Sequence, residues 1–363
     1  MNDNILNKKD YKDIVVVLDA MGGDHSPKIA VQGACKASLK NEFKIILVGD
    51  ETKIATYLKK YKHDENKIQI VHAADEIKMG DHPKDVLRNP NTSIGIAAKI
   101  VGDNKGDALI SAGNTGAVIL ATTKNIDRII GVRRTALATI YPTHNSQKRD
   151  DIFSLILDVG ANVHNSTHEV IHFAFMGNAY VKAIKGIESP TIGLLNIGSE
   201  EYKGGEVLSR TYKILKSIPN INFFGNVEGN DLMKGLVDVV VTEGITGNIA
   251  IKTIEGMAGS MKEVGKLAFK HNMLWKMGMV MLATGIKKLQ DITDFETYGG
   301  APVFGFEKTV IKCHGRSTEK SIDNALVLAA KSVHEDMSGI ISRSIAHFEH
   351  RSGLEEMGRE TNY

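Results

Sequence analysis

Short apolar runs alternate with amphipathic segments along almost the whole chain. Each apolar run has the length of a buried strand, and each amphipathic segment carries apolar residues at helical spacing. The predicted strands are residues 14–18, 44–48, 68–72, 108–111, 137–141, 155–158, 191–196, 237–242 and 309–313. The predicted helices include residues 27–39, 94–101, 169–185, 206–217 and 249–269. Such alternation predicts an α/β fold: a doubly wound, mostly parallel sheet with helices on both faces.

No proline-rich or charged linker divides the 363 residues, so we expect two lobes that share one sheet. This α/β domain is predicted to span residues 14–348, with a helical hairpin near residues 262–292. The polar residues 1–13 are expected to be a disordered extension and residues 349–363 a polar tail. No apolar run approaches the roughly 20 residues of a membrane span, and residues 1–13 lack the apolar core of a signal peptide. A cytoplasmic location is therefore expected.

Composition excludes some classes of function. Hydrophobic residues make up 42% of the chain and charged residues 24%, which is typical of a soluble globular protein. The net charge of +2 gives no indication of nucleic-acid binding, and no nucleic-acid partner is expected. Cys35 and Cys313 lie far apart in apolar segments, so both are expected to be buried thiols. A zinc-binding His-x-x-x-His pair with an intervening glutamate is not expected either, so no metal site is predicted.

The first predicted strand ends in a turn whose sequence is Asp-Ala-Met-Gly-Gly-Asp-His-Ser-Pro, residues 19–27. Ser26 and Pro27 are typical of a helix start, as a cap residue followed by proline. In open α/β sheets, ligands bind at the carboxyl ends of strands. For one such turn alone, a tight connection without a ligand is an equally good interpretation.

The same order of strand, glycine with asparagine or threonine, and helix start recurs at residues 111–117, 158–162, 195–199, 224–230 and 242–248. Glycine lets backbone N–H groups approach an anion, and a helix N-terminus adds partial positive charge. Asparagine supplies a neutral donor and acceptor. Because parallel strands end at one edge of a sheet, these turns are expected to converge on a crevice suited to phosphate and to a developing oxyanion.

Several common catalytic motifs are missing. The chain has no Gly-x-Gly-x-x-Gly after a strand, no Gly-x-x-x-x-Gly-Lys-Ser/Thr loop and no Gly-x-Ser-x-Gly elbow. We therefore expect a site that handles phosphate without a nucleotide cofactor and without a covalent serine or cysteine nucleophile. No cofactor is predicted.

Six segments together closely resemble the phosphate acyltransferase family of phospholipid synthesis, the PlsX family. They are Asp-Ala-Met-Gly-Gly-Asp at 19–24, Ser-Ala-Gly-Asn-Thr-Gly-Ala at 111–117, Asp-Val-Gly-Ala-Asn at 158–162, Leu-Asn-Ile-Gly at 195–198, Thr-Gly-Asn at 246–248 and Tyr-Gly-Gly-Ala-Pro at 298–302. The resemblance covers about residues 14–348. Glu243 and Ile245 stand where the family usually has aspartate and phenylalanine, and Arg316 stands where a small residue is common.

The resemblance implies that acyl-[acyl carrier protein] and inorganic phosphate are converted to acyl phosphate and free carrier protein. The acyl phosphate would then supply a glycerol-3-phosphate acyltransferase at the membrane. The resemblance also implies a homodimer, peripheral contact with an anionic membrane, and a fold similar to isocitrate and isopropylmalate dehydrogenases and to phosphotransacetylase.

Candidate site residues follow from the turns and from the chemistry of the reaction. Phosphate and the acyl group are expected to be bound by Asp19, Gly22, Gly23, Asn114, Thr115, Asn162 and Gly247. Asp19 and Asp24 are expected to orient their loop or a lysine rather than to touch the anion, since a carboxylate repels phosphate. Lys203 would supply positive charge, Asn248 would orient phosphate or donate to the oxyanion, and His25 would protonate the leaving thiolate. Alternatively, Lys203 is a solvated surface residue and His25 merely caps its turn.

Residues 262–288 carry six lysines and one glutamate, together with several methionines and the one tryptophan. Such a segment could dock an anionic carrier protein or an anionic membrane. The residues expected to do so are Lys266, Lys270, Trp275, Met279 and Lys287. The alternative is a helical hairpin whose apolar side packs in a dimer interface.

Three other functions are alternatives to phosphate acyltransfer. An NAD-dependent decarboxylating dehydrogenase shares the implied fold but needs clustered aspartates for a metal, and we find none in the sequence. A phosphotransacetylase that acts on small coenzyme A thioesters is the closest alternative. A non-catalytic scaffold at the membrane would not need several polar turns at strand ends.

Overall fold

The computed structural model describes residues 8–146, 152–282 and 299–352. The described strands are β1 (Val15–Asp19), β2 (Lys44–Gly49), β3 (Ile68–His72), β4 (Ala108–Ser111), β5 (Ala136–Pro142), β6 (Phe153–Leu157), β7 (Thr191–Leu195), β8 (Asn222–Val227), β9 (Val239–Val241), β10 (Ala301–Phe304) and β11 (Thr309–Lys312). The helices are η1 (Tyr11–Asp13), α1 (Lys28–Lys40), α2 (Glu51–Leu58), α3 (Asp85–Arg88), α4 (Ser93–Gly102), α5 (Thr115–Asn125), α6 (Thr167–Tyr180), η2 (Val181–Lys185), α7 (Gly205–Ser217), α8 (Gly244–His271), α10 (Glu319–His334) and α11 (Met337–Ser352).

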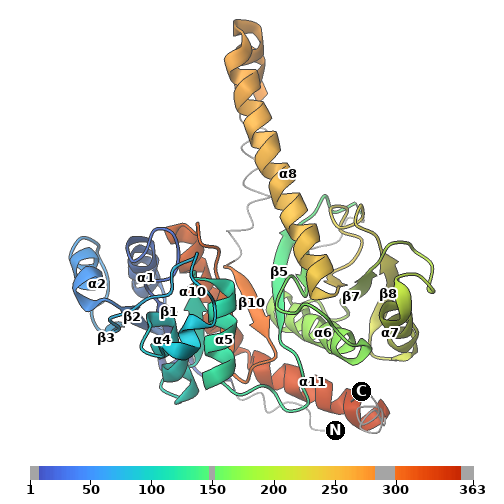
Figure 1. Cartoon of the computed structure of the whole chain (residues 1–363), viewed down its shortest axis with the longest axis horizontal. Helices are drawn as coiled ribbons and strands as arrows, with labels where there is room; N and C mark the ends of the chain where they lie inside the picture. The colour runs from blue at the N-terminus through green and yellow to red at the C-terminus, as the bar shows by residue number, and fades with distance from the viewer. Residues whose placement is uncertain (1–7, 147–151, 283–298, 353–363) are drawn as a thin grey trace.

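All these strands join one 11-stranded sheet in the order β3-β2-β1-β4-β11-β10-β5-β6-β9-β7-β8. A parallel run lies at each end of the sheet, and antiparallel pairings link β11, β10, β5 and β6 in its middle. The two parallel runs form the cores of two lobes (Figure 1). This mostly parallel sheet with helices on both faces confirms the predicted fold class.

The core has one layer on each face of the sheet. On β1, Val16 and Leu18 belong to one cluster of buried side chains and Val17 belongs to the other. Helices α1, α6, α10 and α11 contribute to the first cluster, whereas α4, α5 and the base of α8 contribute to the second. A strand covered on both faces must be apolar throughout, which is why the strand signal in the sequence was continuous rather than alternating.

Two strands depart from the sequence prediction. Residues 224–230 were expected to be a Gly/Asn turn before a short helix, but Asn222–Val227 form β8 and residues 228–235 form turns. Gly225 has a φ of +119°, and the register with β7 shifts between Ile192 and Gly193, so an irregular strand resembled a turn. Strand β10 was missed because it is short and contains Pro302.

Residues 8–13 were predicted to be disordered but are packed against the body. Lys9 Nζ lies 2.7 Å from Asp107 Oδ2, and the Tyr11 ring stacks on His334 with centroids 4.3 Å apart. These contacts join segments remote in sequence, so no local pattern could indicate them. At the other end, α11 extends to Ser352, so the first residues of the expected polar tail are helical.

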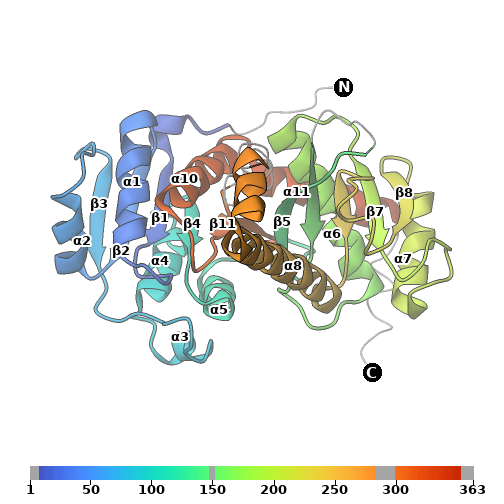
Figure 2. The same cartoon turned by 90° about the horizontal axis from the view of Figure 1, so that it is seen from above.

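Helix α8 projects from the middle of the molecule (Figures 1 and 2). It begins at Gly244, earlier than the predicted residue 249, and ends at His271. Residues 273–282 are helical again, whereas Lys287 and the rest of the expected hairpin lie outside the described residues. Within the described part of the chain, no helix has both the length and the apolar character to cross a membrane.

Candidate functional site

A cleft of about 300 Å³ lies where β5, β10 and β11 meet the start of α8. Its walls come from both lobes and from the middle of the sheet. The lining residues include Thr115, Leu137, Gly160, Asn248, Ile251, Lys252, Ala301, Lys312, Cys313, His314 and Ser317. A concave site with apolar walls and a few polar groups is typical of a small-molecule site.

Three of the five recurring Gly/Asn turns reach this cleft, through Thr115, Gly160 and Asn248. The turns at residues 195–199 and 224–230 do not line it, because β7 and β8 lie at the far edge of the sheet. The expected convergence therefore holds for the turns nearest the middle of the sheet. The opening turn borders an adjacent hollow of only about 10 Å³, which His25 lines.

The opening turn packs tightly against the turn after β4. Ser111 Oγ donates to Asp19 Oδ2 at 2.7 Å, and the Gly113 N–H donates to Ser111 Oγ at 3.0 Å. A Cβ on Gly22 would lie 2.6 Å from the Gly113 nitrogen, so no larger residue fits. Burial raises the pKa of Asp19. With these contacts, the Asp19 carboxylate orients the opening turn.

The opening turn also differs in detail from the expected helix start. Ser26 Oγ donates to the Gly22 carbonyl, and Pro27 rather than Ser26 is the N-cap of α1, which begins at Lys28. Gly23, with a φ of +104°, lets the chain reverse, and the next N–H, that of Asp24, donates to the Gly315 carbonyl at 2.8 Å. The turn is therefore tied to the segment that follows β11.

Two of the predicted phosphate ligands already use their amide groups within the protein. Asn114 caps α5, and its Nδ2 donates to the Met79 and Asp81 carbonyls at 3.2 and 3.1 Å. Asn162 Nδ2 donates to the Thr135 carbonyl and to an Asp158 oxygen, both at 2.7 Å. Donation to phosphate would break one of these bonds, so the role of both residues as ligands stays a prediction.

Asp158, at the end of β6, organises the turn that carries Gly160. Its carboxylate accepts the backbone N–H groups of Leu137, Gly160, Ala161 and Asn162 at 2.9 to 3.1 Å. Burial raises the pKa of Asp158 against the opposing effect of these hydrogen bonds. The carboxylate thus anchors the turn to β5.

The first turns of α8 lie directly over this anchored turn. A Cβ on Gly247 would lie 2.0 Å from the Asp158 carbonyl oxygen, and one on Gly160, whose φ is +126°, would lie 3.3 Å from Asn248 Cγ. Only glycine allows these approaches. Asn248 faces the cleft, and within the described residues no hydrogen bond occupies its amide.

Lys203 and His25, both predicted to be catalytic, do not line the cleft. Lys203 lies in the connection between β7 and α7, where its Nζ is 5.6 Å from the Tyr202 ring centroid. His25 is exposed beside the small hollow. Their catalytic roles stay predictions.

Lys312, at the end of β11, is a cation that the sequence prediction missed. Its side chain lines the cleft but is only 6% exposed, and its Nζ donates to the Cys313 carbonyl. Burial lowers the pKa of Lys312 to about 8, so the amine is mostly protonated at neutral pH. The sequence does contain an indication of this residue, because a lysine within an otherwise apolar strand is rarely buried unless it has a partner.

Cys313 also lines the cleft, but its thiol is not suited to act as a nucleophile. Burial raises the pKa of this thiol to about 12. Since the thiolate is the reactive form, Cys313 is unreactive near neutral pH. A direct attack by an incoming substrate therefore suits this cleft better than a covalent cysteine intermediate.

The chain is similar to known proteins along most of its length. A family model described as "Fatty acid synthesis protein" matches residues 14–339. The phosphate acyltransferase of Dictyoglomus thermophilum is 42% identical over 321 residues, covering 88% of this chain and 94% of that protein. That of Bacillus subtilis is 38% identical over 332 residues, covering 91% and 97%.

Among solved structures, a phosphotransacetylase from Staphylococcus aureus has the same overall fold. Its TM-score is 0.58 at 14% identity, and the match covers 89% of this chain and 95% of that one. At this level of identity the likeness concerns the fold alone.

The hydrogen bonds of the two asparagines predict different losses of stability when each is replaced by alanine. Asn162→Ala removes two hydrogen bonds, one to the Thr135 carbonyl and one to the Asp158 carboxylate, so it should lower the free energy of unfolding by about 1–3 kcal/mol. Asn248→Ala should change stability by less than about 0.5 kcal/mol, since its amide makes no hydrogen bond among the described residues. Urea unfolding of both variants measures this. Equal losses in the two variants would contradict the assignment.

Proposed function

The chain belongs to the phosphate acyltransferase family, as its motifs predicted, and we propose that it transfers the acyl group of acyl-[acyl carrier protein] to inorganic phosphate in the cleft beside α8. The observation that carries this proposal is the composition of the cleft. It combines one buried cation, Lys312, with neutral polar groups at the starts of two helices, Thr115 on α5 and Asn248 on α8. Lys252 and Glu255, which also line the cleft, form an ion pair with each other. Cations and helix N-termini both favour a bound phosphate.

The proposed reaction depends more on positioning the phosphate and the thioester than on a general base. A phosphate oxygen attacks the thioester carbonyl carbon, the new C–O bond forms, and the carbonyl oxygen becomes an oxyanion. The C–S bond then breaks and the carrier thiolate leaves, taking a proton from solvent or from a nearby acid. Inorganic phosphate is already largely a dianion near neutral pH, and a thiol of pKa about 8.5 is a good leaving group.

Each polar group has a place in this scheme. Lys312 holds and partly neutralises the phosphate, and its burial strengthens the attraction because little water screens it. Asn248 donates to phosphate or to the oxyanion, and Thr115 with the start of α5 supports the anion. Lys203 and His25 remain candidates for charge and for proton supply, but each would have to act from outside the cleft described above.

The arm formed by α8 and residues 273–282 suits contacts with other macromolecules. Its exposed apolar side chains include Met261, Val264, Leu267, Leu274 and Trp275. Lys266 and Lys270 lie among them, and Met279 follows beyond the break at Asn272. We propose that this arm contacts a second copy of the chain and an anionic membrane, where a glycerol-3-phosphate acyltransferase would take up the acyl phosphate.

The alternative function is acyl transfer from coenzyme A thioesters, which the shared fold with phosphotransacetylases makes reasonable. The discriminating measurement is phosphate-dependent thiol release from long-chain acyl-[acyl carrier protein] and from acetyl-coenzyme A. We expect release from the first and little from the second. Release from acetyl-coenzyme A alone would favour the alternative, and release from neither would contradict both.

Lys312 can be tested by charge and by pH. Lys312→Met should lower kcat/KM for phosphate by about 100-fold, whereas Lys312→Arg should keep part of the activity. In the natural protein, the amine keeps its proton below about pH 8 and loses it above, so KM for phosphate should rise above that pH. The rise should disappear in Lys312→Arg, whose guanidinium stays charged. A steep rise that persists in the arginine variant would exclude Lys312 as its source.

Membrane contact by the arm can be tested by liposome flotation. A double variant, Trp275→Glu with Met279→Glu, should lose most of its association with anionic liposomes, because burying a carboxylate in the interface is costly. Ile130→Glu is the matched control, since Ile130 is 85% exposed on the body of the molecule. If the double variant folds and floats like the natural protein, the arm is not the membrane contact.

A further inference from the structure

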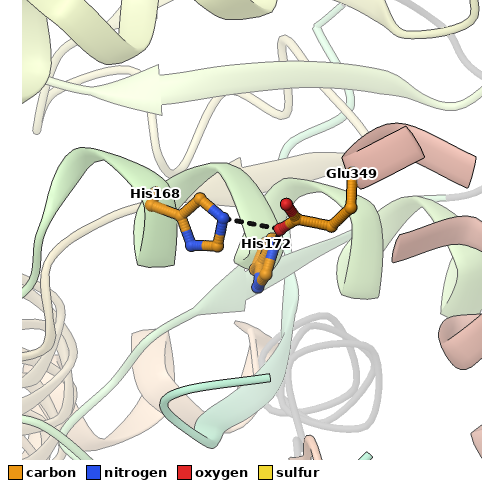
Figure 3. A group of neighbouring side chains, drawn as sticks. All are labelled: His168, His172 and Glu349. Carbon is orange, nitrogen blue, oxygen red and sulfur yellow. Dashed lines mark hydrogen bonds and ion pairs between the residues drawn. The ribbon is translucent and has the colours of Figure 1, made fainter. Parts of the chain in front are cut away.

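Two histidines of α6 and one glutamate of α11 form a cluster outside the cleft (Figure 3). His168 Nε2 and His172 Nε2 lie 2.5 and 2.8 Å from the same oxygen, Glu349 Oε1. One potential ligand atom from each of the three residues lies within 4.8 Å of the others. We propose that His168, His172 and Glu349 bind a zinc ion.

The sequence carries a matching motif. Residues 168–172 read His-Glu-Val-Ile-His, which is the pattern His-Glu-x-x-His. On a helix this spacing puts both imidazoles on one face, one turn apart, and it is a known zinc-binding arrangement. The prediction of no metal site assumed that the chain lacks a His-x-x-x-His pair with an intervening glutamate, and that assumption was wrong. Only the fold brings a third ligand, Glu349, to the pair.

The chemistry of the three donors favours zinc over magnesium or calcium. Two imidazole nitrogens and one carboxylate oxygen are a ligand set that zinc uses, with water as the fourth ligand, whereas the lighter cations prefer oxygen alone. Side-chain exposure of 21% at His168 and 19% at Glu349 leaves room for solvent on one side, while His172 is buried at 1%.

The two nitrogen–oxygen distances need only a small adjustment to hold the ion. Two ligand atoms of a tetrahedral zinc ion lie about 3.3 Å apart for bonds of about 2.0 Å. The present hydrogen-bonded distances are shorter, so the ion would replace the Nε2 protons and push the side chains slightly apart. Each neutral ring would then carry its proton on Nδ1. His168 Nδ1 is buried with no hydrogen-bond partner among the described residues, so we expect weaker binding than in sites with a complete outer shell.

The site is better suited to holding helices together than to hydrolysis. In hydrolytic zinc sites with this motif, the glutamate after the first histidine acts as the base. Here Glu169 accepts the Ser166 N–H at 2.9 Å in the capping box of α6, and Arg134 Nε lies 3.6 Å from it. None of the three proposed ligands lines the cleft. A bound ion would join α11 to α6.

The test uses the full-length protein without a histidine tag, first freed of metal by a chelator. Zinc chloride is titrated by calorimetry, and Tm is measured with and without zinc. Three single variants are compared: His168→Gln and Glu349→Gln within the cluster, and His164→Gln as the control, because His164 is exposed in the loop before α6. Circular dichroism of the metal-free proteins checks folding.

We expect the natural protein and His164→Gln to bind one more zinc ion per chain than the two cluster variants. Zinc should raise Tm in the first pair and not in the second, since binding to the folded state alone stabilises it. The proposal is overturned if the natural protein binds no zinc, or if a folded cluster variant binds as many ions and gains as much in Tm. Glu349→Gln keeps the shape of the side chain, so the test stands even if His168→Gln fails to fold.

Discussion

The close approach of backbone at the ends of β6 and β9 is the constraint on which the cleft depends. The Asp158 carboxylate accepts hydrogen bonds from N–H groups of its own turn and of β5, and α8 begins directly over it. Without a carboxylate there, four backbone N–H groups would lose their acceptor, and without Gly247 the helix could not approach. Asp19 and Ser111 make a similar arrangement in the other lobe. The walls of the cleft are therefore set by buried acids that need not touch the substrate.

The buried charge of the cleft comes from a strand rather than from a surface loop. Lys312 ends β11, opposite Ser111 of β4, and is held among buried groups of the sheet. A lysine in such a place is pre-positioned and poorly screened, so one cation has a large effect on a bound anion. Lys203, by contrast, is half-buried on a connection beyond β9 and outside the cleft. Of these two lysines, only Lys312 lines the cleft.

Glu349, on the last described helix, makes contacts with a helix of the sheet's core layer. Helix α11 packs on α6, where Phe348 lies 4.8 Å from Phe175 between ring centroids. The His168 and His172 rings meet the glutamate one residue later. The expected polar tail included Glu349, because polarity near the end of a chain normally indicates exposure. In the fold it is a partner for a histidine that is almost fully buried.

The sequence by itself determined the fold class, most strands and the family. Continuous apolar runs and glycine turns are local features, and physical chemistry ties them to buried strands and their ends. The turns that contain Thr115, Gly160 and Asn248 were recognisable in the same way, because a turn at the end of a strand consists of consecutive residues. Only the tertiary structure decided which groups face the cleft. The amides of Asn114 and Asn162 are occupied, Lys312 replaces an expected loop cation at the cleft wall, and Glu349 joins His168 and His172. These outcomes depend on contacts between residues far apart in the chain, for which no local pattern carries a signal.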